Sequence, residues 1–192
     1  MDVLLKISRL IDAMNQGIGR FAFWLVLVVT VLSAGTAIAR YGFSTGSNAL
    51  LELQWYLFGA IFMLGAAYGL LTGAHVRIDV LNSRLSRRTQ AWIDVFGTVF
   101  MLLPACFIIA WFGWDMFERS WSIMERSSDA GGLIRWPAKI LIPLGFALLC
   151  LQGLSELIKR IAFLQGRYDW AGPGGHDSNA LPEDAVPAQG KQ

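Results

Sequence analysis

The residue types that could do chemistry gather at the two ends of one apolar segment. Glu52 stands directly before this segment, Trp55 follows within a turn, and His75, Arg77 and Asp79 come after it. Because His75 and Asp79 are four residues apart, their side chains can meet on one face of a helix. Such groups can simply cap and anchor a membrane helix at the interface. They can also form polar contacts that hold a neighbouring subunit or lipid headgroups, and the sequence leaves both interpretations open.

Metal and redox chemistry have few suitable side chains in this sequence. The two histidines, His75 and His176, cannot supply a histidine-rich metal centre or a bis-histidine haem site. The two cysteines, Cys106 and Cys150, form no C-x-x-C pair and cannot build a disulfide-rich scaffold. We therefore expect no enzyme activity, no catalytic or metal-ligating residue and no cofactor.

The elements that carry these groups are predicted to be transmembrane helices. Hydrophobic residues make up 55% of the 192 residues, charged residues 16%, and the mean hydropathy is +0.48; soluble domains average roughly 25% charged residues. The net charge of +2 is too small to indicate a nucleic-acid partner. The apolar runs do not alternate as barrel strands do, so an all-α integral membrane protein is predicted. Four runs approach the roughly 20 residues that a span requires: residues 21–40, 52–74, 92–114 and 136–158.

The segment before the first span has a pattern of its own. Residues 1–20 carry apolar side chains at three- and four-residue steps with polar side chains between them, which predicts an amphipathic helix. We expect this helix to lie on the membrane interface, with a bend favoured by Gly17 and Gly19. The alternative is that it continues the first span into water. A signal peptide is another interpretation of residues 21–40, but this apolar run exceeds the usual length of about 7–15 residues.

The distribution of Lys and Arg predicts the orientation. With four spans, the N-terminus, the second loop and the C-terminus share one side, and the positive-inside rule places both termini in the cytoplasm. That side carries Lys6, Arg9, Arg20, Arg77, Arg84, Arg87, Arg88, Lys159, Arg160, Arg167 and Lys191, and the other side carries Arg40, Arg119, Arg126, Arg135 and Lys139. Residues 21–165 would form the membrane domain, and residues 166–192, rich in Pro and Gly, a disordered cytoplasmic tail.

A glycine motif in the second span is the main packing signal. Gly65, Gly69 and Gly73 recur every four residues, so they share one stripe of a helix on which another helix can approach closely. The stripe can pack within the chain's own bundle or against a partner protein. Both interpretations give the motif a structural role.

The third span is predicted to continue past the membrane. After Trp114 the aromatic residues keep helical spacing as far as Trp121, until glycine and serine residues break the pattern. This extension would form an outer ledge, on which Trp121, Arg126 and Arg135 are candidates for docking another protein. The alternative is an ordinary belt of interfacial aromatic side chains.

The order of these features resembles the small membrane subunit (DctQ type) of tripartite ATP-independent periplasmic (TRAP) transporters. Glu52 opens a glycine- and alanine-rich span that ends in His75-Val76-Arg77-Ile78-Asp79, similar to the H-x-R-x-D signature of that family. A basic loop follows, and Trp136-Pro137-Ala138-Lys139 introduces the fourth span. The resemblance covers about residues 10–165.

The resemblance implies a bacterial inner-membrane protein that takes part in sodium-coupled uptake of a small organic acid. In such transporters a periplasmic substrate-binding protein captures the acid, and a large membrane subunit of the twelve-helix type moves it. The small subunit braces the large one, contacts membrane lipids and is expected to hold no substrate site. From the residues alone, a membrane anchor subunit of a respiratory or redox enzyme complex remains the alternative.

Overall fold

A computed structural model describes residues 2–73 and 85–166. The motif from His75 to Asp79 and all but the first residue of the predicted tail (166–192) lie outside these ranges. Within them the chain is helical and has four helices long and apolar enough to cross a membrane, as predicted. The elements are α1 (Asp2–Gly42), α2 (Asn48–Leu71), α4 (Arg87–Gly97), the π-helix η1 (Thr98–Leu102), α5 (Leu103–Ser122), α6 (Trp136–Lys139) and α7 (Leu141–Leu164).

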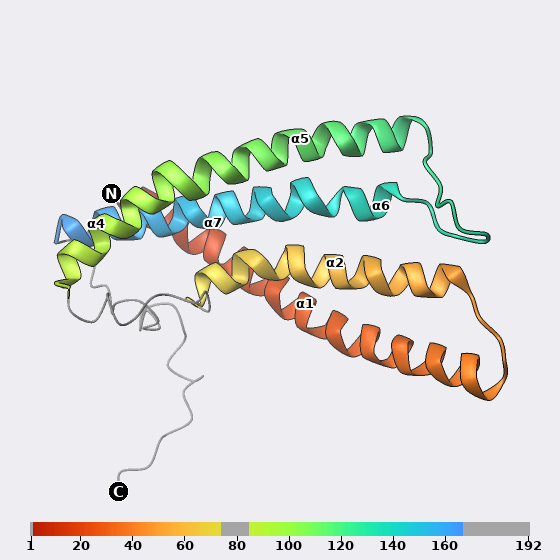
Figure 1. Ribbon diagram of the computed structural model, residues 1–192. Coiled ribbons are helices and arrows are strands. Elements are labelled where there is room, and N and C mark those ends of the chain that lie inside the picture. Colours follow the sequence, from red (N-terminus) through yellow and green to blue (C-terminus); the bar gives the residue numbers. More distant parts are fainter. Residues whose placement is uncertain (1, 74–84, 167–192) are drawn as a thin grey trace, which may run out of the picture.

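The long helices form two antiparallel pairs, and α7 of one pair also contacts both helices of the other (Figure 1). Helix α1 packs against α2, and α5 packs against α7, which also contacts α1, α2 and α4. The start of α1 and the end of α7 lie at the same end of the molecule, together with α4 (Figure 1). We name this the terminal end, and we name the opposite end, which carries residues 43–47 and 123–135, the loop end.

Helix α1 is one unbroken helix of 41 residues. Its length of about 60 Å is twice the hydrocarbon thickness of a bilayer. The predicted separation of residues 1–20 from the first span is therefore not seen, and neither Gly17 nor Gly19 interrupts the helix. Gly19 instead allows close packing, because a Cβ atom there would collide with the ring of Tyr68 on α2. A contact between helices thus outweighs the low helix propensity of glycine.

The third membrane helix contains a π-helical turn. Ser86 caps its start by accepting a hydrogen bond from the Thr89 N–H at 3.3 Å. Over η1 the backbone bonds lengthen by one residue, so that the Leu103 N–H reaches the Thr98 carbonyl. One residue separates this turn from Pro104, which has no N–H to donate. Proline is a common cause of such helix irregularities. The helix then continues past Trp114 to Ser122, as the aromatic spacing predicts.

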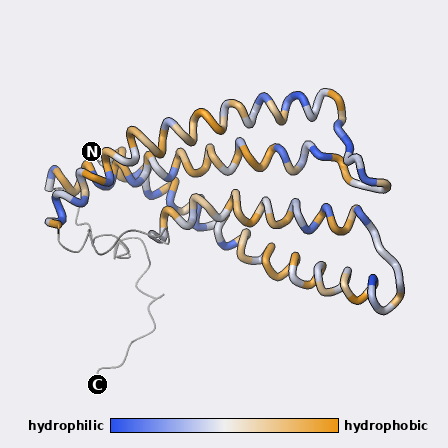
Figure 2. Tube along the Cα trace, viewed as in Figure 1, coloured by the Kyte–Doolittle hydropathy of each residue, from blue (hydrophilic) through white to orange (hydrophobic). Residues whose placement is uncertain are grey.

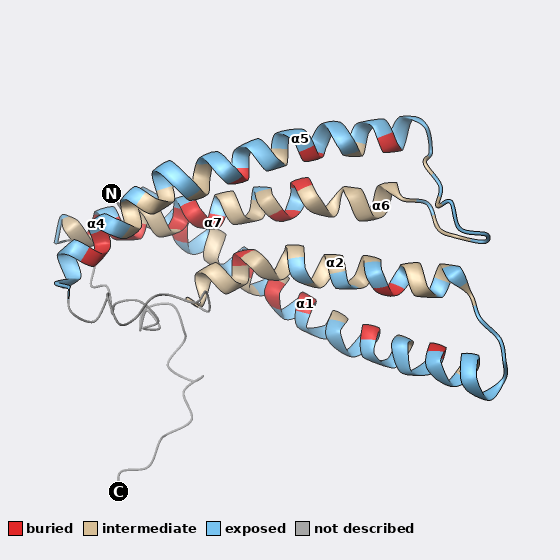
Figure 3. Cartoon of the chain, in the orientation of Figure 1, coloured by how far each residue is buried: buried red, intermediate tan, exposed pale blue. Residues whose placement is uncertain are grey.

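The buried residues are few and mostly small or polar. Figure 3 shows them as small patches where helices face one another, while the outer faces of α1 and α5 are exposed. Figure 2 shows that apolar residues run along the long helices, and many of the exposed residues of α1 and α5 are large and apolar. Polar groups inside and apolar groups outside are the arrangement that a lipid solvent favours.

Candidate functional site

The loop between α5 and α6 folds into a short antiparallel hairpin. The Ser127 N–H donates to the Leu133 carbonyl and the Arg135 N–H to the Glu125 carbonyl, each at 2.9 Å. The turn closes with a bond from the Gly132 N–H to the Asp129 carbonyl, also at 2.9 Å. We call residues 125–135 the loop-end hairpin.

Glu52 fastens this hairpin to the start of α2. The Ser127 hydroxyl donates to Glu52 Oε1, and the Leu133 N–H donates to Oε2 at 2.6 Å. The Asn48 amide adds a bond to the Ala130 carbonyl at 3.1 Å. A Cβ atom at Gly132 would lie 2.9 Å from Glu52 Oε1, so the clamp needs glycine at that position. The structure thus uses Glu52 as a polar lock within the chain.

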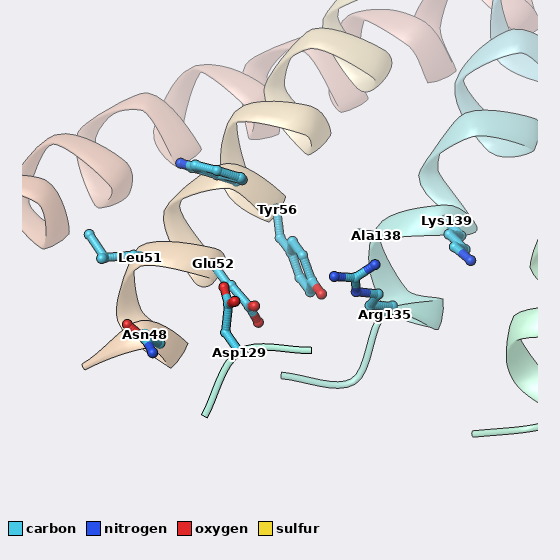
Figure 4. A pocket seen from close by; sticks show the side chains of 9 residues that line it. Asn48, Leu51, Glu52, Tyr56, Asp129, Arg135, Ala138 and Lys139 are labelled. Carbon is cyan, nitrogen blue, oxygen red and sulfur yellow. The ribbon is translucent and has the colours of Figure 1, made fainter. Parts of the chain in front are cut away.

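A pocket of about 470 Å³ lies between α2, the hairpin and α6 (Figure 4). It brings together three of the candidate residues, Glu52, Trp55 and Arg135. Figure 4 shows Tyr56 and Arg135 reaching toward each other from α2 and from the start of α6. Trp55 is 76% exposed beside them. The full lining is Asn48, Leu51, Glu52, Trp55, Tyr56, Asp129, Arg135, Ala138 and Lys139.

The base of the hairpin is held by charge. Lys139 forms an ion pair and hydrogen bond with Glu125, and Arg135 Nη1 lies 3.9 Å from Glu125 Oε1. The hydrogen bond from Lys139, supported by the nearby positive charges, lowers the pKa of Glu125 below its ordinary value. The carboxylate therefore stays ionised throughout the neutral range.

The predicted aromatic ledge forms, but it packs mainly on itself. The Trp121 ring meets Trp136 edge-on at a centroid distance of 4.4 Å, and Phe117 lies against both rings. Trp121 nevertheless remains exposed, as does Arg126 on the hairpin. Of the three docking candidates, Arg135 alone lines the pocket.

Helix α2 has one face that no other helix covers in the part of the chain that the structure describes. Trp55, Phe58 and Phe62 are exposed along it, and a Cβ atom at Gly65 would have nothing within 4 Å. Gly69 belongs to the same stripe by its spacing. In the described structure the glycine motif therefore meets no neighbour of its own chain at Gly65. We call this stripe the open face of α2.

The third glycine of the motif has a different role. Helix α2 ends at Leu71, and Gly73 follows with a φ of +67°. A left-handed glycine just past the last turn is a common way to end a helix. The close helix contacts use other glycines: a Cβ atom at Gly145 of α7 would lie 2.8 Å from the Cβ of Met63 on α2.

The terminal end holds an ionic cluster that the sequence patterns do not predict. Lys159 Nζ lies 2.8 Å from Asp12 and 2.9 Å from Glu156. Arg160 lies 3.1 Å from Glu156 and 3.2 Å from Asp94 of α4. The side chain of Lys159 is only 7% exposed. These five residues, named the terminal cluster, join α1, α4 and α7. The signal available in the sequence is weak: Glu156 precedes the two bases by three and four residues.

A set of uncharged hydrogen bonds extends the terminal cluster along α1 and α7. The hydroxyls of Ser8 and Ser155 lie 2.7 Å apart, and the Asn15 amide donates to Gln152 Oε1 at 2.7 Å. Gln152 and Ser155 in turn both donate to Asp12. Helix α1 thus meets α7 through its polar side. Among the described residues, no three His, Cys, Asp or Glu side chains are grouped to hold a metal ion.

Comparison with known proteins agrees with this architecture. The family model for the DctQ component of tripartite ATP-independent periplasmic transporters matches residues 25–163. The chain is 30% identical over 138 residues to the C4-dicarboxylate TRAP transporter small permease protein DctQ of Pseudomonas aeruginosa, covering 71% of this chain and 63% of that protein. It is 32% identical over 127 residues to the protein of the same name from Rhodobacter capsulatus, covering 64% and 54%.

The chain thus spans between about half and two thirds of the length of these relatives. No solved structure gives a significant match. The family match covers most of the chain and includes part or all of each of the four membrane-length helices. The chain therefore belongs to the DctQ family, the small permease subunits of TRAP transporters.

Proposed function

We propose that this subunit braces a large TRAP membrane subunit during sodium-coupled uptake of a small organic acid delivered by a periplasmic binding protein. The family supports the transporter role, and two relatives are named for C4-dicarboxylate transport. From Leu53 to Leu71, helix α2 contains no charged residue. This suits a helix that packs against a partner subunit and does not coordinate substrate or ions. The family match does not favour the alternative of a redox-enzyme anchor.

The observation that carries the bracing role is the open face of α2. The described contacts of α2 leave the exposed rings of this face uncovered: the Gln54 amide donates to Thr36 of α1 at 3.2 Å and Met63 lies against Gly145 of α7, whereas Trp55 and Phe62 stay exposed. The open face presents large rings toward the loop end and a gap at Gly65. Small residues let a second helix approach closely, so this face suits a helix of the large subunit.

The two ends of α2 are assigned supporting roles in the same proposal. At the loop end, Arg126, Trp121 and the pocket beside Arg135 offer exposed groups for docking the binding protein. At the other end, His75, Arg77 and Asp79 would hold the large subunit or lipid headgroups. The proposed orientation places both termini in the cytoplasm of a bacterium, which puts the loop-end hairpin on the periplasmic side.

The test is to fill the gap on the open face. Gly65→Leu should lower copurification of the large subunit from mild detergent about tenfold, because the leucine holds the two helices apart. Gly35→Leu is the matched control, since Gly35 also faces open space, on α1. Both variants should leave the subunit itself folded. Equal copurification of the two variants would show that the large subunit does not use this face.

A further inference from the structure

Charges at the terminal end are sorted by sign. The three acidic side chains described there, Asp12, Asp94 and Glu156, are all engaged in the terminal cluster. The bases are divided: Lys159 and Arg160 complete the cluster, and the others lie outside it. In the described part of this end, folding therefore draws the negative charge into the cluster and leaves positive charge on the surface.

The bases outside the cluster that the structure describes are all exposed. Among the described residues, none of them forms an ion pair. We name them the basic collar: Lys6, Arg9 and Arg20 on α1, and Arg87 and Arg88 at the start of α4. A surface of five cations without exposed acidic neighbours in the described part attracts anions.

Helix α1 places this charge next to apolar surface. At about 100° per residue, the first five turns divide into three sectors. One sector, with Ser8 and Asn15, packs on α7. A second carries Lys6 and Arg9. The third carries Val3, Ile7, Leu10 and Met14, and Leu10 is 72% exposed.

These three sectors fit the part of a membrane helix that passes through the headgroup region of a bilayer. In water, the apolar sector would turn toward the protein and the polar sector would turn outward, whereas here the polar sector faces α7. Helix α4 also has cations next to exposed apolar side chains, because Trp92 and Phe96 are exposed and follow the two arginines at its start. Apolar side chains beside Lys and Arg on an exposed helix are typical of insertion among headgroups.

We propose that the basic collar binds the headgroups of anionic phospholipids, while the apolar sectors of α1 and α4 enter the upper acyl region. The cations select phosphates with net negative charge, and the terminal cluster makes this possible by withdrawing the acids from the surface. This inference concerns the lipid and not the large subunit, so it holds or fails independently of the open face of α2.

The first experiment measures depth in the membrane. In the full chain, Cys106 and Cys150 are replaced by alanine, and one new cysteine is placed at Leu10 or at Ala13 to carry a fluorescent label. The labelled chain is reconstituted into vesicles of phosphatidylcholine with or without phosphatidylglycerol. The label at position 10 should be quenched by nitroxide lipids, and more strongly with phosphatidylglycerol. The label at position 13, on the basic side, should be quenched by aqueous iodide. Equal quenching of both labels by iodide would overturn the proposal.

The second experiment measures lipid selection. The triple variant K6Q/R9Q/R20Q should retain about tenfold less phosphatidylglycerol after purification from mixed vesicles, whereas the control R40Q/R119Q/R126Q, exposed arginines toward the loop end, should retain the normal amount. Raising the salt concentration should reduce the amount of phosphatidylglycerol that the unaltered chain retains. This measurement tests the proposal even where the triple variant fails to fold. If both triple variants retain the same amount of phosphatidylglycerol, or if retention by the unaltered chain does not depend on salt, the basic collar does not bind anionic lipid.

Discussion

Two carboxylates that fasten the two ends of this bundle, Glu52 and Asp12, have opposite kinds of partner. At the loop end, Glu52 receives an O–H and an N–H from the hairpin, and both donors are neutral. At the terminal end, Asp12 and Glu156 share the charged Lys159. A neutral clamp can open without separating charges, whereas opening an ion cluster of low exposure cannot. The difference indicates that the contact between α2 and the loop-end hairpin can adjust to a partner, while the terminal cluster fixes the frame.

The largest effect should come from breaking the ion cluster. Lys159→Met leaves Asp12 and Glu156 facing each other without their shared cation, so it should lower the free energy of unfolding by about 3 kcal/mol. The measurement is an unfolding titration in mild detergent. Adding Asp12→Asn should recover part of the loss, because the remaining carboxylate then has Arg160. Lys139→Met, at the more exposed ion pair of the loop end, is the matched control. If the two substitutions lower the free energy of unfolding by the same amount, the terminal end is no more rigid than the loop end.

Releasing the neutral clamp should have a smaller and local effect. Glu52→Ala leaves the Ser127 hydroxyl and the Leu133 N–H without their acceptor, so amides of the loop-end hairpin should exchange hydrogen roughly tenfold faster. Glu52→Gln retains an amide oxygen as acceptor and should fall between. Exchange at the terminal end should not change in either variant. Faster exchange throughout the chain would instead show that Glu52 supports the whole bundle.

The sequence predicts the helices better than it predicts their contacts. Apolar runs of membrane length identify all four spans, because lipid imposes the helix whatever its neighbours are. The continuity of α1 is not predicted, because glycine lowers helix propensity locally while its contact with Tyr68 is made in three dimensions. Likewise, the spacing of Gly65 and Gly69 shows that they share a stripe, but it cannot show what faces that stripe. Gly145 makes a close contact with α2, although no glycine repeat in the sequence indicates it.

The candidate site shows the same limit. Glu52 is noticeable from sequence because it is a charge at the edge of an apolar run. Its partners are not, since Ser127 and Leu133 are more than 70 residues away. The pairing of Asp12 with Lys159 joins the two ends of the chain, and no local pattern connects them. Periodicity assigns a side chain to a face of its own helix, whereas the site depends on which faces meet.

The smallest effect should appear when the loop end is acidified. Because Lys139 lowers the pKa of Glu125, the folded hairpin binds a proton less readily than the unfolded chain does. Its stabilisation is therefore complete above the ordinary value of 4.5 and is lost as the pH falls through the lowered folded value. Hydrogen exchange of the hairpin, corrected for the intrinsic pH dependence, should thus stay constant from neutral pH to about pH 5. Lys139→Met should bring the folded pKa of Glu125 back toward 4.5, so the hairpin should be less protected at neutral pH and should lose less of its protection on acidification. An acid-induced loss of the same size with and without Lys139 would assign the acid sensitivity to another carboxylate and leave the ion pair without a part in holding this end.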